Sequence, residues 1–141
     1  MCLSVNLNEV DRYKNLKELE NKYIKTLEED KTVYKILYRI NNHLLAPYQK
    51  FLYEIGKKYH IEKLGTNIKE DDDDGNSYFC IHEGFHAYTS LVDAELMLRQ
   101  GTWYLPHVIV ECTYPKGSKY CEEDYGIMCV SDTIIINEII E

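Results

Sequence analysis

Three consecutive isoleucines near the C-terminus, Ile134, Ile135 and Ile136, place the strongest constraint on the fold of this chain. β-branched side chains favour strands, and successive residues of a strand point to opposite faces of its sheet. The run therefore puts apolar side chains on both faces, and both must be covered to keep them from water. The stretch VSDTIIINEII predicts a central strand that is covered on both sides.

Alternating residues predict further strands upstream. In TVYKILYRI, Tyr34, Ile36 and Tyr38 lie on one predicted face, and Lys35 and Arg39 lie on the other. The segment HVIVECTY alternates in the same way. These segments indicate a sheet built from strands that are separate in the sequence.

Two segments carry apolar residues at three- and four-residue steps, which is typical of amphipathic helices. The first covers about residues 9–29, with Asn8 as its N-cap, and the second begins after Ser90 and ends at Gly101. At 141 residues the chain fits one domain. We therefore expect a single α+β domain over residues 1–141, with a mostly antiparallel sheet covered by two helices.

The charges are unevenly distributed along the chain, whose formal net charge is −8. Basic residues prevail in the segment 32–69, and acidic residues prevail from residue 70 onward. An acidic half disfavours independent nucleic-acid binding, because phosphate affinity comes from Lys and Arg, and it favours a basic protein surface as partner. The N-terminus lacks a signal-peptide pattern and no apolar run is long enough to span a membrane. We expect a soluble, cytoplasmic protein.

Two stretches are candidate partner-binding surfaces. The first is GTNIKEDDDDGNS at 65–77, predicted as a mobile acidic loop because like charges repel, and its central residues are Asp71, Asp72, Asp73 and Asp74. The second combines aromatic anchors with an acidic rim, a pattern that suits protein interfaces. Its candidates are Trp103, Tyr104, Tyr120, Glu122, Glu123, Asp124 and Tyr125.

An enzymatic alternative remains open, although the residues lean against catalysis. In an ADP-ribosyltransferase-like site that uses NAD, Arg39 would grip the phosphates, Ser90 would orient the ribose, and Glu138 would stabilise the transition state. The three residues occur in the required chain order. Each also has a structural interpretation, since Ser90 is a predicted N-cap and Glu138 ends a strand.

The five cysteines are an odd number in a chain without a signal peptide, so we expect free thiols. Cys80, His82 and His86 are close enough in sequence to be considered as metal ligands, but no tight ligand pair accompanies them and no metal is predicted. A nucleophile formed by Cys80 or Cys112 with His82 or His86 is a further possibility. Apart from NAD in the alternative site, no cofactor is expected.

Several segments resemble a family of small, functionally uncharacterised proteins from bacteriophages, large DNA viruses and Bacteroidota-type genomes. The similar segments run from MCLSV to VSDTIIINEII, and EGFHAYTSLVDA and VIVECTYPKGSKY contain the most distinctive motifs, GFHAY and PKGSKY. The resemblance implies a shared fold and no established reaction.

By analogy with small acidic phage proteins that counter host defence, we expect a non-enzymatic, phage-type inhibitor. Its partner would be a basic host protein that handles nucleic acid, such as a CRISPR nuclease. If the basic side chains of the segment 32–69 cluster, they could contact RNA held by that nuclease. Those side chains are Lys50, Lys57, Lys58 and Lys63.

Overall fold

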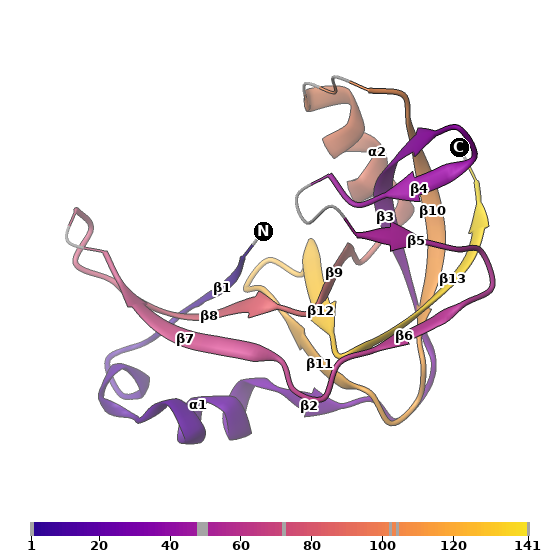
Figure 1. Ribbon diagram of the computed structural model, residues 1–141. Helices are drawn as coiled ribbons and strands as arrows, with labels where there is room; N and C mark the ends of the chain where they lie inside the picture. The colour runs from indigo at the N-terminus through magenta and orange to yellow at the C-terminus, as the bar shows by residue number, and fades with distance from the viewer. Residues whose placement is uncertain (1, 48–50, 72, 102, 104, 141) are drawn as a thin grey trace.

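The computed structural model describes residues 2–47, 51–71, 73–101, 103 and 105–140, so Asp72 and Tyr104 lie outside the described residues. These described residues form two sheets and two short α-helices in one small domain (Figure 1). The three-stranded sheet has the order β1 (Leu3–Asn6), β8 (Ser77–Glu83), β7 (Gly65–Glu70). All pairings between described strands of both sheets are antiparallel, as predicted.

The second sheet is ten-stranded, and its strands come from most of the chain. Its main path follows the order β2 (Lys25–Thr26), β11 (Lys119–Glu122), β12 (Met128–Ser131), β9 (Phe85–Tyr88), β3 (Lys31–Ile40), β10 (His107–Tyr114), β13 (Thr133–Ile139), β6 (Lys58–His60). β4 (His43–Leu45) pairs with the end of β3, and β5 (Leu52–Tyr53) pairs with β4. Residues 85–88 follow β8 directly after Gly84, so one continuous run of chain serves both sheets.

The isoleucine run lies where the sequence predicts it. β13 is hydrogen-bonded to β10 on one side and to β6 on the other. Ile134 and Ile136 are fully buried in the largest apolar cluster, together with Val33 and Leu37 of β3, whereas Ile135 is half-buried. The predicted strand is therefore present and one of its faces is buried in the core, but β13 lies next to the terminal strand β6 and its Ile135 face is only partly covered, so the expectation of a strand covered on both sides is not met.

The second predicted helix is α2 (Leu91–Gln100). The Ser90 hydroxyl accepts a hydrogen bond from the Asp93 N–H (3.1 Å), and the helix ends at Gly101 as predicted. Ala94 is fully buried and belongs to an apolar cluster with Ile36 and Ile109 of the sheet. α2 contacts β3 and β9, and α1 (Leu16–Tyr23) contacts β7. Because the two α-helices are short, these contacts do not show that the helices cover the sheet, and that expectation stays a prediction.

The predicted helix over 9–29 is wrong in extent. The Asn8 side chain accepts hydrogen bonds from the Val10 and Asp11 N–H groups at the start of a 3-10 turn (Asp11–Tyr13), and the α-helix begins only after Asn15. The Asn15 and Glu18 side chains form a reciprocal capping box there, a signal that the sequence contains. Two residues of the assumed apolar stripe, Val10 and Tyr13, are exposed, which is why the longer helix has no face to bury.

Asp11 ties the 3-10 turn to α1. Its carboxylate accepts hydrogen bonds from Lys22 Nζ (2.5 Å) and the Tyr23 hydroxyl (2.5 Å), and Lys14 Nζ lies 2.9 Å from the second oxygen. These partners cover the carboxylate completely, although the segment lies at the surface. Lys22, Tyr23 and Lys14 hold the pKa of Asp11 well below its usual range.

The predicted acidic loop over 65–77 is also too long. Residues 65–70 form β7, which pairs with β8, so the connection shrinks to residues 71–76. Within it, the Asp71 N–H donates to the Asn76 carbonyl (2.9 Å), and the Asp74 carboxylate accepts hydrogen bonds from the Asn76 N–H (2.7 Å) and the Tyr78 hydroxyl (2.7 Å). Aspartate side chains thus build the turn, a role that charge repulsion alone does not predict.

The two halves of the ten-stranded sheet meet at β9 and β3, where Tyr34 and Tyr88 form the only register pair recorded between these two strands. Two interior side chains add to this pair. Lys35 Nζ donates to the His86 carbonyl, and the buried Tyr114 hydroxyl donates to the Phe85 carbonyl (2.5 Å). Side chains therefore supply hydrogen bonds where the backbone ladder is short.

We predict that Tyr114→Phe lowers the free energy of unfolding by about 1–2 kcal/mol, because it deletes a buried hydrogen bond at this junction. The matched control is Tyr125→Phe, which removes the same hydroxyl from a side chain that is 89% exposed. Urea unfolding of both variants measures the difference. Equal stabilities would contradict the role of the Tyr114 hydroxyl.

Candidate binding surface

The turn between β11 and β12, residues 123–127, carries the acidic residues and the exposed tyrosine of the second candidate surface. The Glu123 N–H donates to the Met128 carbonyl (3.1 Å), and the Glu123 carboxylate accepts from the Met128 N–H (3.1 Å). The Gly126 N–H donates to the Glu123 carbonyl (3.0 Å), and the φ of +69° at Gly126 suits glycine. The turn is thus closed by its own hydrogen bonds.

Neighbouring elements hold the same turn from two sides. The Asp124 carboxylate accepts a hydrogen bond from the Asn6 N–H at the end of β1 (2.9 Å). On the other side, the Thr89 N–H donates to the Ile127 carbonyl (3.0 Å), and the Thr89 hydroxyl donates to the Gly126 carbonyl. Tyr125 remains 89% exposed. The turn therefore presents a free aromatic ring on a fixed backbone, with carboxylates beside it.

Two of the predicted aromatic anchors serve the interior instead. Tyr120 lies in β11 and is only 8% exposed, and the centre of its ring lies 6.0 Å from the centre of the Tyr114 ring. Trp103 is half-buried, its indole N–H donates to the Leu98 carbonyl (3.0 Å), and its ring meets Tyr38 edge-on. Tyr120 belongs to the largest apolar cluster and its neighbour Cys121 belongs to the second, so β11 buries a side chain on each face. Tyr104 lies outside the described residues.

The acidic turn of the β7–β8 hairpin is a separate place on the molecule. The hairpin projects away from the ten-stranded sheet, whereas the β11–β12 turn lies beside β1 (Figure 1). Asp73 and Asp74 are exposed and Asp71 is half-buried. Arg12 donates to the Gly75 carbonyl (2.7 Å), which places a cation against this turn. The two predicted acidic surfaces therefore do not merge into one patch.

The structure does not bring Arg39, Ser90 and Glu138 together. Glu138 pairs with Glu111, which in turn pairs with Tyr34 of β3. Arg39 lies five residues further along that strand, or about 16 Å at 3.3 Å per residue. Ser90 is the N-cap of α2, as its structural interpretation predicts. None of the three lines the cleft beside α1, the cleft beside the β11–β12 turn or the cleft beside the β7–β8 turn.

Lys35 is a polar residue of the interior that the sequence does not reveal. The alternation in β3 placed it on a face opposite to the tyrosines, but that face also carries Val33 and Leu37 and forms the main core. The Lys35 amine donates to the His86 carbonyl and lies 5.5 Å from the centre of the Tyr53 ring. No carboxylate of a described residue pairs with it. Burial lowers the pKa of Lys35.

His86 is likewise held inside the sheet rather than exposed as a base. Its Nε2 lies 3.0 Å from the Ile81 carbonyl oxygen, and its Nδ1 lies 3.2 Å from that of Gly84. Burial outweighs these two carbonyl groups and lowers the pKa of His86 to about 4. The imidazole is therefore neutral at pH 7, which fits a structural role.

The cysteines and histidines form neither a nucleophile nor a metal site in the described part of the chain. Burial raises the pKa of Cys112 to about 12, so its thiol stays protonated at neutral pH. Cys80 is buried with its sulfur 3.4 Å from the Ser4 hydroxyl, whereas His82 is exposed. Among the described residues, no three His, Cys, Asp or Glu side chains gather where they could hold a metal ion.

No family model, curated protein or solved structure matches the chain. The resemblance to the phage and Bacteroidota family therefore stays a prediction. Neither helix in the described ranges has the length and apolar character to cross a bilayer. A cytoplasmic location stays a prediction as well.

The burial of His86 predicts acid sensitivity. Histidine titrates near 6.5 in an unfolded chain, so between pH 6.5 and 4 the unfolded state binds a proton that the folded state does not. Stability is therefore full above pH 6.5 and falls by about 3 kcal/mol as the pH drops to 4.

Urea unfolding between pH 7.5 and 4.5 tests this expectation, with the exposed His82→Gln as a control that keeps the pH dependence and His86→Gln as the variant that loses it. An NMR titration of the His86 ring measures the pKa directly. A ring pKa near 6.5 in the folded protein would contradict the assignment.

Proposed function

We propose that this protein is a small, acidic, non-enzymatic binding protein whose β11–β12 turn docks on a basic surface of another protein. The observation that carries the proposal is Tyr125, an almost fully exposed aromatic ring on a turn that β1 and Thr89 hold in place. Tyrosine is among the residues that contribute most to binding energy at protein interfaces.

Preorganisation is the physical reason to favour this turn over the other acidic segment. Ordering a loop during binding costs free energy that a loop already held by hydrogen bonds does not pay. The β11–β12 turn is held from outside by Asn6 and Thr89, and acidic residues precede the tyrosine in the chain. The acids Glu122 and Asp124 are exposed and can steer a basic partner to the tyrosine.

The chemistry of the partner follows from the charge. With a net charge of −8, the protein is repelled by nucleic acid and attracted by basic proteins. Two lysines of the basic segment are already engaged, since Lys63 pairs with Glu20 (3.7 Å) and Lys57 lies over the Tyr59 ring. Lys50 lies outside the described residues. These contacts support docking on the partner protein more than on RNA bound to it.

A host protein that handles nucleic acid has the basic surface that such a turn requires. We therefore propose a phage-type inhibitor of a nuclease, of the CRISPR kind for example, that acts in the cytoplasm of the host. The NAD-dependent alternative finds no support in the positions of Arg39, Ser90 and Glu138.

We predict that Tyr125→Ser reduces capture of the partner at least tenfold, because it removes the central aromatic contact. The matched control is Tyr13→Ser, since Tyr13 is 87% exposed on the 3-10 turn. Affinity capture from host lysate, with and without nuclease treatment, measures both variants. Equal capture by Tyr125→Ser and Tyr13→Ser would refute the docking surface, and loss of capture after nuclease treatment would show that nucleic acid bridges the two proteins.

We further predict that the double variant Glu122→Gln, Asp124→Asn associates with the captured partner several-fold more slowly at low salt. The difference should shrink above about 0.1 M salt, where the Debye length falls below about 10 Å. Glu28→Gln, Glu29→Gln removes the same charge from exposed residues between β2 and β3 and serves as the control. Identical slowing in both double variants would assign the effect to net charge instead of the turn.

A further inference from the structure

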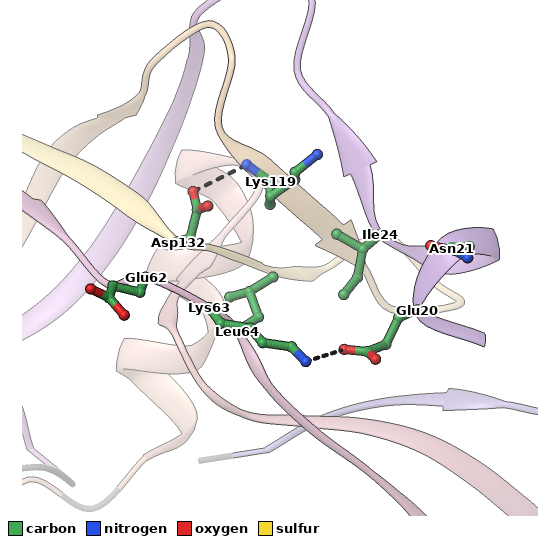
Figure 2. Close-up of a pocket in the computed structure, with 8 residues that line it drawn as sticks. All are labelled: Glu20, Asn21, Ile24, Glu62, Lys63, Leu64, Lys119 and Asp132. Carbon is green, nitrogen blue, oxygen red and sulfur yellow. Dashed lines mark hydrogen bonds and ion pairs between the residues drawn. The ribbon is translucent and has the colours of Figure 1, made fainter. Parts of the chain in front are cut away.

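A cleft of about 420 Å³ lies between α1, the segment that joins β6 to β7, and β11 (Figure 2). Ile24, at the end of α1, and Leu64 contribute its apolar wall. Asp132, between β12 and β13, contributes a carboxylate. The volume falls within the range of small-molecule sites.

Asp132 is held rigidly at this position. Its backbone N–H donates to the Lys119 carbonyl (3.3 Å), and its carbonyl accepts from the Ile61 N–H (2.9 Å). One carboxylate oxygen, Oδ1, accepts hydrogen bonds from the Lys119 N–H (3.1 Å) and the Thr133 hydroxyl (3.0 Å). The orientation of the carboxylate is therefore fixed by its neighbours.

The second oxygen, Oδ2, has no hydrogen-bond or ion-pair partner in the described part of the chain, although Asp132 is only 7% exposed. Figure 2 shows it turned towards the space between Lys119 and Ile24. A carboxylate oxygen that no protein group occupies can accept a charge-assisted hydrogen bond from a cation that enters the cleft.

The two lysines that line the cleft are turned to other partners. Lys119 Nζ donates to the Thr26 hydroxyl (2.8 Å), and Lys63 Nζ pairs with Glu20 (3.7 Å), as the dashed line in Figure 2 shows. Neither amine lies within ion-pair distance of Asp132. The cleft thus combines the fixed carboxylate of Asp132, and the carboxylates of Glu20 and Glu62 that also line it, with an apolar wall.

We propose that this cleft binds an organic cation, an ammonium or guanidinium group on a short aliphatic stem. The cationic head donates to Asp132 Oδ2, and the stem packs on Ile24 and Leu64. The cation comes either from a free small molecule or from a Lys or Arg side chain of another protein. The site is independent of the β11–β12 turn, because Lys119 and that turn lie at opposite ends of β11.

The experiment is an NMR titration of the intact protein with N-butylguanidinium and with its neutral isostere N-butylurea. We expect saturable shifts of the Lys119 and Thr133 amides with N-butylguanidinium, and binding at least tenfold weaker with N-butylurea. Equal binding of the two compounds, or no shift with either, overturns the proposal.

Two variants locate the site. Asp132→Asn keeps an oxygen for the Lys119 N–H but removes the charge, and should weaken binding about tenfold. Asp124→Asn removes the same charge at the distant turn and should change nothing. If Asp132→Asn does not fold, Ile24→Trp, which fills the cleft from the wall, should block binding while Asp132 stays in place. Wild-type affinity in Asp132→Asn, or in Ile24→Trp where Asp132→Asn does not fold, overturns the site.

A peptide with the sequence Gly-Gly-Arg-Gly-Gly distinguishes the two sources. Binding tighter than that of N-butylguanidinium supports the site and assigns it to an arginine side chain of a partner. Weaker binding also supports it and assigns it to a free cation. Because Tyr125→Ser leaves the cleft unchanged, its result bears on the docking surface alone.

Discussion

The short junction between β9 and β3 is the constraint on which the rest of the structure depends. The Tyr34 and Tyr88 pair joins the two halves of the ten-stranded sheet there, and the carbonyl groups of Phe85 and His86 are bound by interior side chains. This explains why a lysine and a tyrosine hydroxyl lie inside an apolar core. Burying either polar group costs desolvation free energy. In each case the group donates a hydrogen bond to a β9 carbonyl, at the junction where β9 and β3 share few backbone hydrogen bonds.

The candidate binding surface depends on the same strand. β9 ends at Tyr88, and the next two residues have separate roles: Thr89 holds the β11–β12 turn, and Ser90 caps α2. The position of Tyr125 is therefore set by the core of the sheet, through one residue of chain. A loop that is attached to the core only at its two ends would not hold its side chains in a fixed position. This coupling makes the turn a better docking element than the β7–β8 hairpin, whose aspartates bond mainly within their own turn.

The sequence predicts what local patterns determine. The isoleucine run, the alternation of β10, and the Ser90 cap with Gly101 at the helix end all lie as expected, because each signal and its consequence lie within a few residues. The prediction of one helix over 9–29 is wrong because the apolar spacing continues across Asn15, which is the residue that caps the actual helix. The burial of Tyr120 and the inward position of Lys35 have a different cause, since the pattern shows that a strand has two faces but not which face other strands cover.

Folding also changes the meaning of the charge pattern. In the linear sequence the segment 32–69 is basic, but Lys35 is turned into the core and Lys63 is paired with Glu20. The acids of the second half remain at turns, where Glu122, Asp124 and Asp73 are exposed. Folding thus withdraws Lys35 from the surface, whereas Lys57, Lys58 and Lys63 remain exposed. Asp132 places a further carboxylate in a cleft, where one of its oxygens has no protein partner and the walls keep a bound cation close to it.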